Sequence, residues 1–180
     1  MSENLTVTLP FFGETKLSKV SYWKYLYEGH LRKHAHNGMD IDIDVHFKVL
    51  DEMAIKKVCK ALGDIDKLNA LGVNAFTNDY NAGGESKYYV GEWGNDIFGQ
   101  IFTEEELQEY LAPTDSSMPI EERLLSLLRL VRIGIYSGSD DSFIVLDYAF
   151  GYEIDKGFRD SMLIVKMNER YEVVNIVMEG

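Results

Sequence analysis

The chain has 180 residues, of which 46% are apolar and 27% charged, so it can bury a core and is not disordered. Its formal net charge of −12 argues against nucleic-acid binding, which needs clustered Lys and Arg. No stretch approaches the roughly 18 apolar residues of a membrane span, and the first residues lack the pattern of a signal peptide. Cys59 is the single cysteine, which fits a reducing cytosol. These features predict one cytoplasmic domain over residues 1–180.

The first elements expected are β-strands. Leu5 to Leu9 forms a short strand that Pro10 ends, and Ser21 to His36 forms a second. Met39 to Val49 alternates strictly between apolar and polar residues, which is typical of a strand with one face buried. Asn37-Gly38 lies between the last two strands and predicts a hairpin.

Two registers compete in this hairpin. A two-residue loop puts His34 opposite Ile41, so that polar side chains lie on the apolar face. A three-residue loop puts His34 opposite Asp42, and the charged residues of both strands then share one face. Since a one-residue slip exchanges the two faces of a strand, the three-residue loop is predicted.

The middle of the chain predicts helices, because apolar residues recur there at helical spacing. Asp51 is the N-cap of the first helix, and Thr103 with Glu106 forms a capping box for the fourth. The expected helices cover residues 51–62, 65–80, 89–101, 103–111 and 119–130. Residues 87–93 also permit a strand.

The remaining residues return to a period of two and predict strands over 131–135, 143–150, 162–167 and 172–177. Strands therefore come first, helices in the middle and strands last. This order predicts the α+β class, with a mainly antiparallel sheet built from the N-terminal hairpin and the C-terminal strands. The inserted helices are expected to pack on one face of that sheet.

The predicted register gathers His34, His36, Asp40 and Asp42 into a square on one sheet face. Imidazoles and carboxylates together can hold zinc or manganese. A flat ladder seldom converges on one ion, because neighbours on one face of a strand are roughly 6.5–7 Å apart. The simpler interpretation is a solvated ladder of opposite charges, so no metal, no other cofactor and no catalytic residue is assigned.

Two single residues also attract attention. Asp147 lies in the apolar run of residues 143–150, where a carboxylate could be catalytic. More often such a carboxylate is the outward residue of an amphipathic strand, or it pairs with a nearby cation such as Arg132 or Arg159. Cys59 lies on an apolar helix face and is expected in the core. Motifs of nucleophilic hydrolases, phosphate-binding loops, dinucleotide sites and zinc proteases are absent, which argues against an enzyme.

The acidity of the chain permits a basic protein partner, although it also serves solubility alone. If the acidic face binds such a partner, its centre is expected at Asp40, Asp42 and Asp44. Tyr22 and Tyr25 would form the rim, because aromatic side chains are favoured at interfaces.

Several short segments carry a resemblance to a bacterial family of proteins of unknown function: Leu9-Pro-Phe-Phe-Gly13, the strand Asp40 to Val45, Arg132 to Tyr136, Leu146-Asp-Tyr148, Leu163 to Val165, and Met178-Glu179. That family supplies no catalytic residues. Small acidic α+β proteins of this type also resemble immunity proteins that neutralise toxins. We therefore expect a protein-interaction module, in its sharpest form an immunity-like protein. The alternative is a metal-assisted hydrolase that uses the square of histidines and aspartates.

Overall fold

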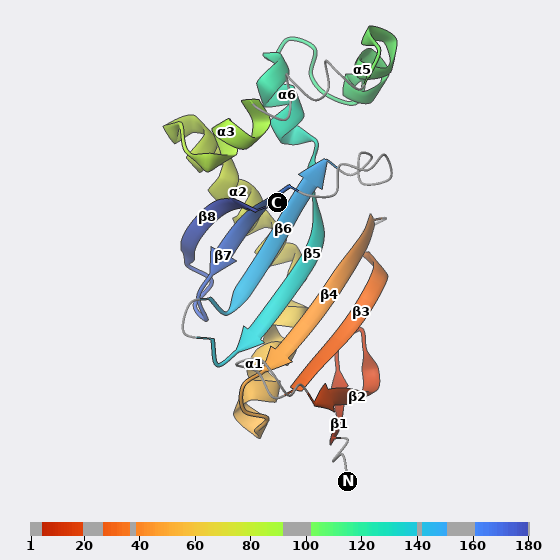
Figure 1. The fold of residues 1–180 in the computed structure, drawn as a ribbon, viewed down its shortest axis with the longest axis vertical. Helices are drawn as coiled ribbons and strands as arrows, with labels where there is room; N and C mark the ends of the chain where they lie inside the picture. The colour runs from red at the N-terminus through yellow and green to blue at the C-terminus, as the bar shows by residue number, and fades with distance from the viewer. Residues whose placement is uncertain are drawn as a thin grey trace. The chain divides into compact units, whose positions relative to one another are not determined.

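A computed structural model describes residues 5–19, 27–36, 39–91, 102–139, 142–150 and 161–179 (Figure 1). Its strands are β1 (Leu5–Leu9), β2 (Gly13–Lys19), β3 (Tyr27–His36), β4 (Met39–Phe47), β5 (Leu128–Ser137), β6 (Ile144–Phe150), β7 (Met162–Met167) and β8 (Val173–Glu179). Its helices are α1 (Glu52–Gly63), α2 (Ile65–Ala82), α3 (Glu85–Val90), α5 (Glu104–Leu111) and α6 (Ile120–Ser126). Among the described residues, no helix combines the length and hydropathy that crossing a membrane requires.

The strands form one sheet whose spatial order follows the chain from β1 to β8. Strands β1 to β4 pair antiparallel, whereas β4 and β5 pair in parallel. Parallel neighbours need a long crossover connection, and the helical middle of the chain supplies it. The sheet is therefore mixed, and the predicted α+β class with an N-terminal antiparallel hairpin is confirmed.

The chain divides into two compact units. The first contains Met1–Gly72, Leu130–Asp147 and Val165–Asn175, and the second contains Val73–Arg129, Tyr148–Ile164 and Ile176–Gly180. Helix α2 and strands β5 to β8 contribute residues to both, and a single domain over residues 1–180 stays a prediction.

The core of the first unit follows from the alternation in β4. Ile41, Ile43, Val45 and Phe47 are at most 1% exposed, while Asp40 on the opposite face is exposed. Figure 1 draws α1 on the far side of the strands, and the buried side of this helix is apolar. The predicted assignment of the two faces of this strand is confirmed.

The β1–β2 hairpin approaches β3 closely at Gly29. A Cβ atom at this position would lie 3.1 Å from a methyl group of Leu17 and 3.1 Å from a methyl group of Val45. Glycine therefore permits the hairpin to pack on the apolar face. Strand β2 was not predicted. Strand β3 covers Tyr27–His36, and residues 21–26 of the strand expected from Ser21 lie outside the described residues.

The hairpin of β3 and β4 contains a β-bulge that corrects the predicted register. Next to the loop, His34 pairs with Ile41 and His36 with Met39, which is the register of the two-residue loop. Farther away, Leu31 pairs with Ile43, so two residues of β3 stand opposite Asp42 alone. The extra residue restores the match of polar with polar side chains beyond the bulge. The predicted pairing of His34 with Asp42 is wrong because only uniform registers were compared.

The helices begin where their caps predict. The Asp51 side chain accepts a hydrogen bond from the Ala54 amide at 2.7 Å, and the capping box of Thr103 and Glu106 is formed. Helix α6 ends at Ser126 rather than near Leu130, because Leu128 begins β5 with its side chain buried. Helix α3 covers only the beginning of the predicted third helix, and residues 92–101 lie outside the described residues.

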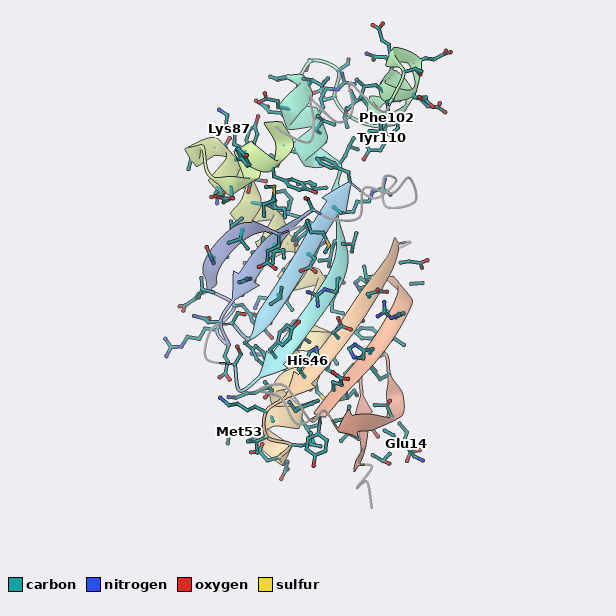
Figure 2. All side chains as sticks on the ribbon, viewed as in Figure 1. Glu14, His46, Met53, Lys87, Phe102 and Tyr110 are labelled. Atoms are coloured by element: carbon teal, nitrogen blue, oxygen red, sulfur yellow. The ribbon has the colours of Figure 1, made fainter. Side chains whose placement is uncertain are left out.

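Polar contacts join several helices of the second unit, in addition to its buried apolar side chains. Tyr80 donates a hydrogen bond to Glu121 at 3.0 Å, and burial together with this contact raises the pKa of Tyr80 to about 12. Arg123 donates to the Leu111 carbonyl at 3.1 Å and so ties α6 to the end of α5. Figure 2 shows the neighbouring rings of Phe102 and Tyr110, whose centroids are 5.9 Å apart.

Candidate functional site

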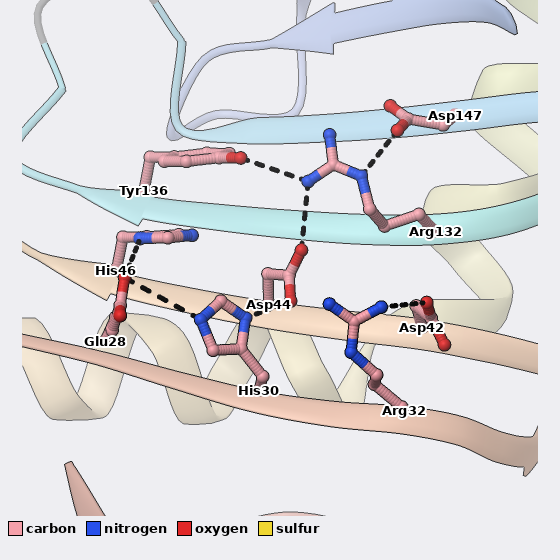
Figure 3. A network of polar contacts seen from close by, with 9 residues as sticks. All are labelled: Glu28, His30, Arg32, Asp42, Asp44, His46, Arg132, Tyr136 and Asp147. Carbon is pink, nitrogen blue, oxygen red and sulfur yellow. Dashed lines mark hydrogen bonds and ion pairs between the residues drawn. The ribbon is translucent and has the colours of Figure 1, made fainter. Parts of the chain in front are cut away.

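A network of charged and aromatic side chains lies on one face of β3, β4 and β5, within the first unit (Figure 3). We call this surface the polar face; it consists of Glu28, His30, Arg32, Asp42, Asp44, His46, Arg132 and Tyr136. The side chains face one way because each strand places every second residue on the same side. Figure 3 shows helices behind the strands and the network in front.

Asp44 is at the centre of the network. Its Oδ1 lies 2.5 Å from His30 Nδ1, and its Oδ2 accepts a hydrogen bond from Arg132 at 3.1 Å. Burial alone would raise the pKa of Asp44, but the hydrogen bonds from His30 and Arg132 outweigh it and hold that pKa below its usual range. Asp44 therefore stays ionised, and its side chain is only 17% exposed.

Arg132 joins Asp44 to Asp147 on the next strand. Its Nε donates to Asp147 Oδ2 at 2.5 Å, and the Asp147 side chain is fully buried. Burial would lower the pKa of Arg132, but the charge of Asp147 and the hydrogen bonds raise it instead. Of the alternatives considered for Asp147, the pair with Arg132 is formed, and the outward position on an amphipathic strand is wrong because Asp147 is fully buried. Because a buried carboxylate must keep its partner, Asp147 holds the Arg132 guanidinium in one position.

Tyr136 and His46 form the aromatic part of the polar face. They are register partners across the parallel pair, and their rings stack with centroids 4.6 Å apart and planes 4° apart. The Tyr136 ring lies over Gly134, where a Cβ atom would come within 2.5 Å of ring carbon Cε2. Because residue 134 is glycine, the Tyr136 hydroxyl reaches Arg132 and accepts its hydrogen bond at 3.2 Å.

His46 and His30 lie side by side on the polar face, on either side of the same carboxylate. Burial lowers the pKa of His46, and the nearby charge of Asp44 opposes this shift only in part, so the imidazole is neutral at pH 7. His30 is 42% exposed, and its Nε2 lies 3.7 Å from Glu28 Oε2. The same carboxylate oxygen is 3.9 Å from His46 Nδ1, so Glu28 lies beside both rings.

The predicted square of His34, His36, Asp40 and Asp42 is not formed. Because of the bulge, His34 and His36 share the face of Ile41, and His36 Nε2 contacts Asp66 of α2 at 2.8 Å. Asp40 and Asp42 point to the opposite side of the sheet. Within the described residues, no group of three or more histidine, cysteine or acidic side chains could hold a metal ion.

The five residues expected to bind a partner do not all lie together on the polar face. Asp40 is exposed, and Asp42 lies at the edge of the polar face with an ion pair of 3.5 Å to Arg32. Both carboxylate oxygens of Asp44 contact residues of the chain itself, His30 and Arg132. Tyr22 and Tyr25 lie outside the described residues.

Sequence reasoning missed the joining of His30 and Asp44 to Arg132 and Tyr136. The missing signal is the parallel pairing of β4 with β5, since 80 residues of chain separate these strands and no turn fixes a parallel register. Cys59 is half-buried, and burial raises the pKa of its thiol, which disfavours a nucleophilic role.

A shallow pocket of about 180 Å³ lies at the carboxyl ends of β4 and β5 and shares no residue with the polar face. Among the side chains that line it, Lys57 is occupied by two contacts of 2.8 Å with Glu169. The pocket is smaller than the roughly 300–1,000 Å³ of most ligand sites. The polar face is therefore the better candidate for recognition. It is an open surface suited to contact with another macromolecule and not a pocket that encloses a small ligand.

Comparison with known proteins adds no function: no family model matches the chain, and neither does any curated protein or solved structure.

Proposed function

We propose that the protein is a cytosolic protein-interaction module and that the polar face is its recognition surface. The observation that carries this proposal is the anchoring of Asp44 by His30 and by Arg132, itself held by the buried Asp147. Such a network holds exposed polar groups in one arrangement before a partner arrives. A preorganised surface binds at a lower cost in conformational entropy.

The chemistry of the surface favours a basic partner. The formal charge of −12 would speed the approach of a cationic protein. We expect such a partner to meet Asp42, at the edge of the polar face, and the exposed Asp40 beside it, because both oxygens of Asp44 already have partners. The pair of Asp42 with the largely exposed Arg32 is long, and exposed pairs contribute only about 0.2–1 kcal/mol. A cation from the partner can therefore replace Arg32.

The sharpest form of this proposal is an immunity-like protein that occupies a basic toxin, and a basic protein encoded by a neighbouring gene is the expected partner. The alternative, a metal-assisted hydrolase, has weaker support. It needs His34 and His36 to converge with Asp40 and Asp42, and the bulge separates the two pairs by the thickness of the sheet.

The test is a binding assay between the purified chain and the basic protein encoded beside it. The double variant Asp40→Asn, Asp42→Asn should associate more slowly than the wild type, by roughly tenfold at low salt. The matched control is Glu104→Gln with Glu105→Gln, which removes the same charge from the exposed first turn of α5. Equal effects of the two double variants, or no binding by the wild type, would contradict the proposal.

A further inference from the structure

Strand β8 differs from its neighbour β7 in that none of its seven residues is buried. Val173 and Val174 are 43% and 49% exposed, and as neighbours in a strand they point to opposite faces. In β7, by contrast, Leu163, Ile164, Val165 and Met167 are all buried. Both faces of β8 are therefore exposed at the beginning of the strand, and residues 176–178 are half-buried.

The sheet ends at β8, so one edge of this strand has no neighbouring strand among the described residues. Natural proteins protect such edges with lysine, proline or a bulge, because unpaired backbone groups invite another strand. From Val173 to Met178 the strand has no charge and no proline, and four of its six residues are Val or Ile. The edge has the composition of a strand that pairs with another chain.

We propose that β8 pairs with β8 of a second copy of this chain, antiparallel across a twofold axis. Two identical strands related by a twofold axis must run antiparallel. With Asn175 on the axis, Val173 faces Val177 of the second copy and Val174 faces Ile176. Pairs of β-branched residues stabilise a sheet.

Charge selects this register over its neighbour. If the axis passed between Asn175 and Ile176, Glu172 would face Glu179 of the second copy, and like charges directly opposite destabilise a sheet. With the axis at Asn175, Glu172 faces Met178 and no acidic residues are opposed. The uncharged segment of residues 173–178 gives two chains of net charge −12 a place to meet without opposing carboxylates.

The experiment is light scattering after size-exclusion chromatography over a dilution series. The wild type should dimerise, and its dissociation constant should fall as salt rises, because salt screens the repulsion between two acidic chains. Asn175→Asp places two carboxylates at the axis and should raise that constant at least about tenfold. Asn78→Asp, at an exposed position of α2, makes the same chemical change and should leave it unaltered.

A wild type that is monomeric at every concentration, or equal effects of the two Asn variants, would overturn the proposal. Circular dichroism checks the folding of each variant, and Asn175 is exposed, so its replacement should not unfold the chain. Opposite salt dependences distinguish the two proposals, because binding of a basic partner to the polar face weakens with salt.

Discussion

The polar face and strand β8 are both accessible parts of the β-sheet, but they differ in how far contacts within the chain satisfy their polar groups. On the polar face, Asp44, Arg132 and Asp147 satisfy one another, and the surface is ordered by contacts within the chain. Strand β8 has no buried side chain and ends the sheet. In our two proposals, the first surface binds a partner that matches its charges, whereas the second pairs with another strand.

The largest effect is expected from placing a charge on the buried face of β4, on the other side of the sheet from the polar face. Ile43 is fully buried behind it, so Ile43→Asp buries a carboxylate that has no cation and should cost about 5 kcal/mol or more of unfolding free energy. Asp42→Ala, one position away, should cost less than about 1 kcal/mol. Urea denaturation measures both, and similar losses would refute the assignment of the faces.

Removing the cation that orders the polar face should have the next largest effect. Arg132→Met leaves buried Asp147 without its guanidinium partner and should cost about 3–5 kcal/mol. The control is Arg32→Met, which breaks a long and exposed ion pair and should cost less than about 1 kcal/mol. Adding Asp147→Leu to Arg132→Met should recover much of the stability. A double variant as unstable as Arg132→Met would show that the ion pair is not the source of the loss.

The aromatic part of the polar face depends on the absence of a side chain at residue 134. In Gly134→Ala the new methyl group would overlap the Tyr136 ring, so the ring must leave His46, and the expected cost is about 1–3 kcal/mol. Gly63→Ala is the control, because a Cβ atom there meets nothing within 4 Å. Thermal unfolding measures both variants, and a Gly134→Ala protein as stable as Gly63→Ala would contradict this geometry.

The smallest effect concerns pH. Because the pKa of folded His46 lies below its usual 6.5, the unfolded chain binds a proton more readily at this site. The resulting contribution to stability is complete above pH 6.5 and is lost as the pH falls through the folded pKa. In His46→Phe, which keeps a ring for Tyr136 to stack on, this loss should be absent. Unfolding free energies from pH 8 to pH 5 test it, and a constant gap between variant and wild type would be evidence against a depressed pKa.

Local signals predicted much of the fold. The strict alternation in β4 defines its buried face, and Asp51 and Thr103 mark helix starts because their side chains cap free amides at short range. The pair of Asp147 with Arg132 was one of the alternatives that the sequence left open, since a buried carboxylate needs a cation. These features depend on residues close in sequence or on the cost of burying one charge.

Two features could not be predicted, and both concern pairing between strands. The bulge at Arg32 and Lys33 combines two registers that alternation treats as exclusive, and it moves His34 and His36 away from Asp40 and Asp42. The parallel register of β4 and β5 joins residues far apart in the chain, so nothing local aligns His46 with Tyr136. The candidate site depends on both features, which is why its main residues were missed.

Mapping of the bound surface by NMR tests the central claim most directly. The labelled chain is titrated with the basic protein encoded by its neighbouring gene, and amide shifts are followed in both surfaces. We predict that the changes fall on residues 28–32, 40–46 and 132–136 and leave 173–178 unchanged. Changes confined to other residues, or no changes at all, would contradict the assignment of the polar face as the recognition surface.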